Sequence, residues 1–192
     1  TTYIKIFCTD DVLVHCDLLD MPGISDPNMP SQVWERMISM VQGVLWCSHA
    51  TQAWRQSEAA VWESLPHELY ANSLLLLTRA DKLTSPTDRE KVIRRVKAET
   101  QGLFLDCLPI SLLQATSVQD DYDAWLESGA GAFAERFADL LKGLSSARHL
   151  NTGRENLEPD LENLVIPGLE GPANPNSAAP NPIEPETTQR II

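Results

Sequence analysis

Hydrophobic positions along this chain alternate between strand-like runs and helical spacing. Apolar runs with the length and composition of β-strands occur at residues 3–7, 12–19, 43–47, 73–78 and 108–113. Apolar residues at helical spacing predict helices near residues 33–41, 57–69, 87–96 and 133–144. The first two strands are expected to form a hairpin, and the four leucines of residues 74–77 suit a strand that is covered on both faces. Strand and helix alternate after the hairpin, which predicts a three-layer α/β fold with a mainly parallel sheet.

Two details refine the predicted boundaries. Thr87 followed by Glu90 has the spacing of a capping box, so a helix is expected to begin there. Residues 111–117 are polar and follow the last strand, which predicts a turn.

Ser48 and His49 do not form a nucleophile and base pair, because adjacent residues of a strand point in opposite directions.

The composition changes near residue 150 and divides the chain into two parts. Residues 151–192 hold seven of the 13 prolines, six asparagines, and seven acidic against two basic residues. Such a segment buries too little apolar surface to offset the entropy of ordering. We therefore expect one folded domain at residues 1–150 and a disordered acidic tail at residues 151–192 rich in proline and asparagine.

The net charge of −12 excludes the partners that need a basic surface. A chain with this charge has no general footprint for nucleic acid and is not attracted to an anionic membrane. No apolar run reaches the roughly 20 residues of a spanning helix, and no basic and apolar leader opens the sequence. The four cysteines have no metal-site spacing and are read as reduced thiols. These features predict a cytoplasmic protein.

Three short motifs fall where a predicted strand ends and a loop begins, which is where α/β sheets carry their chemistry. In the first, Asp20, Pro22 and Gly23 close an apolar strand. A carboxylate there can hold a hydrated Mg²⁺ through water, and an unhindered glycine amide can approach a phosphate oxygen. The alternative is an ordinary turn at the end of a buried strand.

The second and third motifs suit recognition of a purine. Thr78, Arg79 and Asp81 match the pattern [NT]-[KR]-x-D, in which the carboxylate accepts hydrogen bonds from guanine and the cationic side chain covers the ring. Ala115 lies 34 residues after Asp81, where a small residue can offer its amide to the guanine carbonyl. An ordinary charged loop and a polar turn are the alternatives for these two stretches.

The order and the intervals of the three motifs resemble the GTP-binding domains of the P-loop GTPase superfamily over about residues 1–145. Threonine at position 78, Pro22 and the segment of residues 51–58 are similar to the bacterial dynamin-like branch. The resemblance implies Mg²⁺ with GTP as cofactor and substrate, GTP and GDP as ligands, and hydrolysis of GTP to GDP and phosphate. It assigns Asp20 to Mg²⁺ through water and Gly23 to the γ-phosphate. It also assigns Arg79, Asp81 and Ala115 to the base, with Thr78 bracing the loop.

Two departures from the superfamily pattern limit what the 192 residues are expected to do. The phosphate loop GxxxxGK[ST] does not occur in them, so we expect the first strand and that loop to lie upstream of Thr1. Ile24 occupies the position at which Ras-like members orient water with glutamine, so Ile24 is not catalytic. By itself this chain is expected to be inactive.

The resemblance also suggests partners, and one rival function stays open. A second copy across the nucleotide face is the implied partner, whereas membrane contact is not supported by this segment and nucleic acid is not expected. The rival is a non-enzymatic scaffold or interaction protein on a degenerate GTPase fold.

Overall fold

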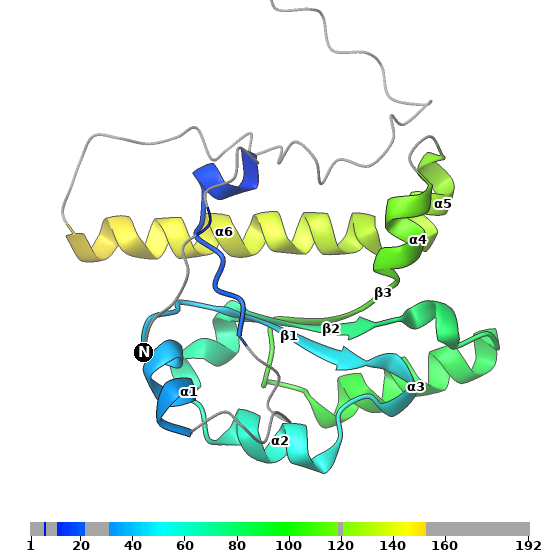
Figure 1. Cartoon of the computed structure of the whole chain (residues 1–192), viewed down its shortest axis with the longest axis horizontal. Coiled ribbons are helices and arrows are strands. Elements are labelled where there is room, and N and C mark those ends of the chain that lie inside the picture. Colours follow the sequence, from blue (N-terminus) through cyan, green and yellow to red (C-terminus); the bar gives the residue numbers. More distant parts are fainter. Residues whose placement is uncertain (1–5, 7–10, 22–30, 119–120, 153–192) are drawn as a thin grey trace, which may run out of the picture.

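The sheet at the centre of the fold has three parallel strands. The computed structural model describes residues 6, 11–21, 31–118 and 121–152. The strands are β1 (Val44–His49), β2 (Ser73–Thr78) and β3 (Asp106–Ile110), in the spatial order β1-β2-β3 (Figure 1). Val44 pairs with Ser73, and Leu74 pairs with Asp106. The expectation of an α/β fold with a parallel sheet is therefore confirmed.

Helices cover both faces of this sheet. The α-helices are α1 (Ser31–Ile38), α2 (Gln56–Glu63), α3 (Pro86–Glu99), α4 (Leu112–Ser117), α5 (Tyr122–Glu127) and α6 (Ala130–Thr152). Short 3-10 helices are η1 (Asp11–Val14), η2 (Ala50–Gln52), η3 (His67–Asn72) and η4 (Ala80–Lys82). Helix α6 crosses one face of the sheet, and α1, α2 and α3 lie on the other, so the fold has three layers (Figure 1).

The four consecutive leucines of β2 are buried on both faces, as their sequence predicts. Leu74 and Leu76 pack in the cluster on the α6 side with Phe137, and Leu75 and Leu77 pack in the cluster on the α2 and α3 side. This division follows from the strand period, in which successive side chains point to opposite faces. A central parallel strand therefore reads as a continuous apolar run.

Aromatic side chains fill much of the cluster on the α2 and α3 side of the sheet. Trp62 of α2 is fully buried and stacks on Phe104, with ring centroids 4.1 Å apart. Trp46 of β1 meets the same indole edge to face at 5.3 Å. Trp54 contacts Phe104 in the same edge-to-face manner. These rings fix the position of α2 and of the loop that precedes it.

Asp106 links the helices on the two faces at the beginning of β3. Its carboxylate forms ion pairs with Lys97 of α3 and with Arg136 of α6, each at 3.2 Å, and it accepts a hydrogen bond from the Cys107 amide. Partial burial alone would raise the pKa of Asp106, but the Cys107 amide and the two cations lower it below the ordinary value.

The predicted opening hairpin is not found among the described residues. The first strand, residues 3–7, lies outside them apart from Ile6, and the second, residues 12–19, is not a strand. Part of it forms η1, and residues 15–21 have no regular structure. The described sheet offers this segment no neighbouring strand, and a strand without a partner leaves its backbone groups unpaired. Val12 and Cys16 instead pack against the α6 side, and Met21 packs against the opposite cluster.

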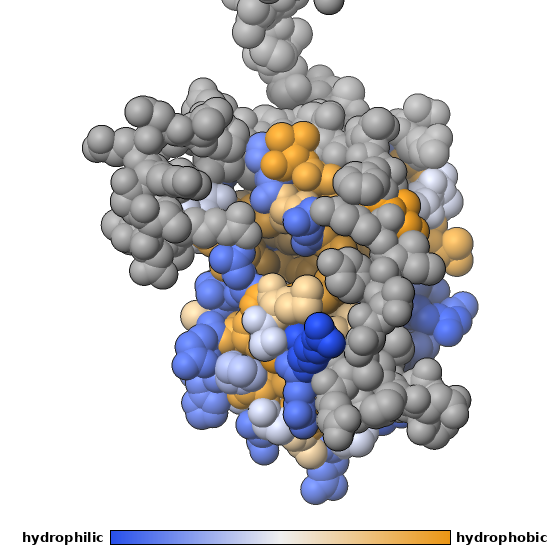
Figure 2. Space-filling model, turned by 60° about the vertical axis from the view of Figure 1, so that its left-hand side comes forward, coloured by the Kyte–Doolittle hydropathy of each residue, from blue (hydrophilic) through white to orange (hydrophobic). Residues whose placement is uncertain are grey.

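Apolar surface remains exposed in this part of the molecule. Val14 is 75% exposed to solvent and Leu18 is 59% exposed. Figure 2 shows hydrophobic atoms in a hollow on the side that it brings forward. The apolar pattern of residues 12–19 is therefore not fully buried by the described fold.

Two predicted helix boundaries are wrong for local reasons. Helix α2 ends at Glu63 rather than near Leu69, because Pro66 follows closely and disfavours helical backbone at the residue before it. Helix α3 is capped by Ser85, whose hydroxyl accepts a hydrogen bond from the Asp88 amide, and not by Thr87. Pro86 occupies its first turn, where a missing N–H costs nothing.

The predicted last strand is also shorter than expected. Strand β3 ends at Ile110, and α4 replaces both the end of the predicted strand and the predicted turn. The hydroxyl of Ser111 accepts a hydrogen bond from the Gln114 amide and so caps α4. The fourth predicted helix is confirmed as α6, with Phe137 and Leu141 buried.

The predicted tail falls almost wholly beyond the described residues. The tail was predicted for residues 151–192, but Asn151 and Thr152 belong to helix α6, and residues 153–192 lie outside the described residues. Among the helices that the structure describes, none has both the length and the apolar character needed to cross a bilayer.

Candidate functional site

Three loops meet at the carboxyl edge of the sheet. Because β1, β2 and β3 are parallel, the segments that follow them begin at the same edge, and these segments are η2, η4 and the start of α4. The turns η2 and η4 are in contact, and η4 also contacts β3. The predicted specificity motif therefore lies between two neighbouring loops.

Thr78 and Arg79 shape the beginning of the central loop. The Thr78 hydroxyl donates a hydrogen bond to the Ser48 carbonyl oxygen of β1 at 3.2 Å, as expected for a residue that braces the loop. Arg79 has left-handed backbone with φ of 56° and ψ of 40°. A non-glycine residue adopts this conformation only where its surroundings impose it, so the chain turns sharply at Arg79. This turn separates the buried strand from the exposed arginine side chain.

Asp81 is held in place by Ser111, the residue that directly follows strand β3. The Ser111 hydroxyl donates a hydrogen bond to Asp81 Oδ1 at 2.8 Å, and Lys82 Nζ lies 3.6 Å from Oδ2. The Ser111 hydrogen bond is the largest influence on the pKa of Asp81 and lowers it, the Asp81 amide and Lys82 lower it further, and desolvation opposes them. Asp81 is therefore ionised at neutral pH, and its second oxygen has lone pairs to offer.

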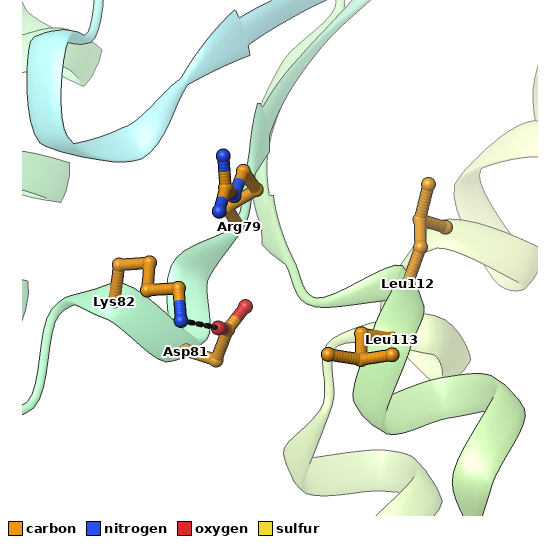
Figure 3. Close-up of a pocket in the computed structure, with 5 residues that line it drawn as sticks. All are labelled: Arg79, Asp81, Lys82, Leu112 and Leu113. Atoms are coloured by element: carbon orange, nitrogen blue, oxygen red, sulfur yellow. Dashed lines mark ion pairs between the residues drawn. The ribbon is translucent and has the colours of Figure 1, made fainter.

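These residues border a small open pocket. Its volume is about 130 Å³, and it is lined by Arg79, Asp81, Lys82, Leu112 and Leu113. Figure 3 shows Arg79, Asp81 and Lys82 on one side and the two leucines of α4 across from them, with the Asp81 carboxylate between. Leu112 is 56% exposed to solvent and Leu113 is 73% exposed. The pocket combines a fixed anion, two cations and an apolar wall.

A second group of hydrogen bonds lies behind this edge and was not predicted. Glu58 of α2 is buried, and its Oε2 accepts from the Ser48 hydroxyl at 2.9 Å and from the Arg55 amide at 2.8 Å. Ser48 and His49 do not pair, as predicted: the Ser48 hydroxyl bonds Glu58, whereas His49 Nδ1 accepts from the Thr51 amide at 3.3 Å. The alternation along β1, which puts Ser48 on the same buried face as Trp46, was the available sequence signal.

The structure does not bring every predicted site residue into the pocket. Thr78, Arg79 and Asp81 lie at this edge, but Asp20 is exposed and is not among the residues that line the pocket. Pro22 and Gly23 lie outside the described residues.

The expectation for Ala115 does not fit the geometry. Its amide donates to the Ser111 carbonyl oxygen within α4, so it has no N–H to offer a ligand. The prediction for Ala115 depends on its interval of 34 residues after Asp81 and on its place just past the predicted last strand. Because Ser111 begins a helix instead, the residues that face Asp81 are Ser111, Leu112 and Leu113.

The described residues do not form a divalent metal site on their own. No group of three or more His, Cys, Asp or Glu side chains with suitable placement occurs within the described ranges. Asp20 is a single exposed carboxylate there. Mg²⁺ therefore stays a prediction.

The chain was compared with known proteins at three levels. No protein-family model, no curated protein and no solved structure matches it. What the fold and the site define is a class: a mixed α/β protein with a charged pocket at the carboxyl edge of a parallel sheet.

Proposed function

We propose that this chain is the base-recognition part of a guanine-nucleotide-binding domain of the P-loop GTPase type, similar to the dynamin-like branch. In its intact form such a protein hydrolyses GTP to GDP and phosphate with Mg²⁺. The observation that carries the proposal is the Asp81 carboxylate, which Ser111 orients into the pocket at the carboxyl edge. The three parallel strands in sequential order are compatible with this architecture.

The pocket chemistry suits guanine better than adenine. Asp81 can accept hydrogen bonds from the N1–H and the exocyclic amine of guanine, two donors that lie side by side on one edge of the base. Adenine has an acceptor at N1, so a carboxylate there meets a lone pair. The Arg79 stem covers one face of the base, and Leu113 offers apolar contact from across the pocket. The role proposed for Ala115 passes to Leu112 and Leu113, the first residues of α4, which line the pocket.

The phosphate side of the proposed site needs residues that the 192 do not supply. Hydrolysis requires a GxxxxGK[ST] loop, and the proposal therefore concerns a reading frame in which this loop precedes the chain. A P-loop strand beside β1 would pair with the side of β1 that has no partner among the described residues. It would also cover apolar side chains such as Leu18. Asp20 would then approach the metal through water, and Gly23 the γ-phosphate.

The sharpest test exchanges the hydrogen-bonding pattern of one residue. Xanthine has a carbonyl where guanine has the exocyclic amine, so Asp81→Asn, which offers one acceptor and one donor, should prefer xanthosine, whereas the unmodified chain prefers guanosine. Binding of both nucleosides to the 192-residue chain is measured by ligand-observed NMR, with Asp88→Asn as a control on an exposed carboxylate of α3. Equal binding of guanosine, adenosine and xanthosine by the unmodified chain would refute the proposal.

One observation favours the rival scaffold function. Leu112 and Leu113 present two exposed apolar side chains beside the pocket, which is typical of a surface that binds protein. The proposed second copy across the nucleotide face would use the same leucines. Nucleotide competition on the longer reading frame separates these functions. A scaffold predicts that added GTP displaces no bound nucleotide, whereas a GTPase predicts that GTP, but not ATP, displaces the bound guanine nucleotide.

A further inference from the structure

Glu58 is a buried carboxylate that the proposed recognition of guanine does not use. Only 5% of the residue is exposed, and its Oε2 accepts hydrogen bonds from the Ser48 hydroxyl and from the Arg55 amide. The Ser48 hydroxyl in turn accepts from the Trp54 amide at 3.0 Å. Burial of an ionisable group is costly unless its oxygens are bonded, so these contacts are what allow Glu58 to lie inside the fold.

The loop that this carboxylate holds is strained. Trp54 has left-handed backbone with φ of 56°, which is unfavourable for a bulky residue. Its neighbours are fixed on both sides: the Ala53 carbonyl oxygen accepts from the Arg95 guanidinium at 2.8 Å, and the Arg55 amide donates to Glu58. Backbone in this region persists only where several contacts determine it together. Glu58 supplies one of these contacts directly and the Trp54 contact through Ser48.

Ser48 connects this loop to the specificity motif. Its hydroxyl binds Glu58, and its carbonyl oxygen accepts from the Thr78 hydroxyl. Thr78 directly precedes Arg79, the residue at which the chain turns toward Asp81. The turn η2, which follows β1, also contacts η4. The hydrogen bonds thus continue from α2 through β1 to the beginning of the loop that carries Asp81.

We infer that Glu58 is a positioning residue for the guanine-specificity loop, acting through Ser48 and Thr78. This inference rests on the proposed function. The Glu58 carboxylate fixes the Ser48 side chain and the strained loop, and these fix the β1 backbone against which Thr78 is bonded. Its loss loosens η4, so that Asp81 no longer presents its oxygens to the base at a constant angle. A residue that only caps α2 would affect the stability of that helix and leave η4 unchanged.

The first measurement needs no ligand. The amides of Lys82 and Leu83 are bonded within η4, and those of Trp125 and Phe133 are bonded in the distant α5 and α6 region. In Glu58→Gln, which weakens the acceptor, hydrogen exchange at the η4 amides should rise about tenfold relative to the α5 and α6 amides, a factor that corresponds to the difference between a charge-assisted and a neutral hydrogen bond. Thr78→Val, which removes only the hydroxyl that bonds Ser48, should have the same local effect.

The second measurement uses the base itself. Inosine lacks the exocyclic amine of guanosine, so the preference for guanosine over inosine reports how well Asp81 is oriented. Both variants should lower this preference, and Glu63→Gln, which alters an exposed carboxylate on the same helix, should leave exchange and preference unchanged.

The outcomes separate the inference from the function on which it rests. A uniform rise in exchange over all four amides, or an unchanged guanosine preference in Glu58→Gln, would overturn the positioning role while the function stands. An unmodified chain with no guanosine preference would overturn the proposed function and the positioning role together.

Discussion

Gly129 occupies a position where the structure forbids any side chain, and this can be tested directly. The residue joins α5 to α6 with φ of +88°, a conformation that residues with a Cβ rarely adopt. A Cβ built there would lie inside the van der Waals contact of the Pro109 carbonyl oxygen and 3.2 Å from Ile110 Cα. Both neighbours are backbone atoms of β3, so they cannot move aside as a flexible side chain would.

The expected cost of Gly129→Ala follows from these two effects. Left-handed backbone costs a residue with a Cβ about 1–2 kcal/mol, and insertion of a methyl group into packed structure costs about 1–3 kcal/mol. We therefore expect Gly129→Ala to lower the free energy of unfolding by about 2–5 kcal/mol.

Two other glycines serve as matched controls. Gly102 has φ of +80° with open space around it, so Gly102→Ala should show only the backbone cost of about 1–2 kcal/mol. Gly143 lies within α6 with nothing near the added methyl, so Gly143→Ala should stabilise the protein by about 0.5–1 kcal/mol. Urea unfolding followed by circular dichroism measures all three.

The Gly129 variant should also affect the candidate site. The Ser111 amide donates to the Ser128 carbonyl oxygen at 2.8 Å, directly before Gly129, and the Ser111 hydroxyl holds Asp81. A shift of this junction should move the pKa of Asp81 back toward its ordinary value. If Gly129→Ala is no less stable than Gly102→Ala, the close approach of Gly129 to β3 is wrong.

Two further predictions concern carboxylates with a lowered pKa. Ser111→Ala should raise the pKa of Asp81 toward its ordinary value of about 3.9, as measured by NMR titration of its carboxyl carbon, and an unchanged titration would show that Ser111 does not orient Asp81. Because the folded-state pKa of Asp81 is the lower one, its contribution to stability is present above about pH 4 and is lost as the pH falls through the folded pKa. Asp106→Asn keeps an acceptor for the Cys107 amide but removes two partly exposed ion pairs, so it should destabilise the protein by about 1 kcal/mol at neutral pH. Its folded-state pKa is lowered too, so the stabilities of variant and parent should converge as the pH falls below about 4; a difference that persists in acid or in high salt would contradict the electrostatic origin.

The sequence predicts the buried half of this fold well, because burial leaves a periodic pattern. The leucine run of β2 could be read as a strand covered on both faces, and its bounds agree with the structure. The spacing of Phe133, Phe137 and Leu141 predicted α6 for the same reason. The run at residues 12–19 is equally apolar but is not a strand among the described residues. Pattern indicates that a segment tends to be buried, but it does not tell whether a neighbouring strand is present to pair with it.

The candidate site was predicted in part for a different reason. The residues from Thr78 to Asp81 follow an unambiguous strand, so the parallel sheet was enough to place them at the carboxyl edge. The contact between Ser111 and Asp81 spans 30 residues and depends on where β3 ends. That end was predicted too late, and Ala115 was proposed in place of the residues that face the pocket.

Capping chemistry explains both the missed helix and the misplaced start of another. Ser111 followed by Gln114 has the same spacing as Thr87 followed by Glu90, yet only Ser111 caps a helix. At residue 87 the signal fails because Ser85, followed by Pro86, provides a hydroxyl and a fixed φ two residues earlier. At residue 111 it holds because the serine directly follows the last residue of β3 and no earlier cap competes. The hydroxyl that begins α4 is the same hydroxyl that donates to Asp81, so the chemistry that stops the strand also orients the carboxylate on which the proposed recognition of guanine depends.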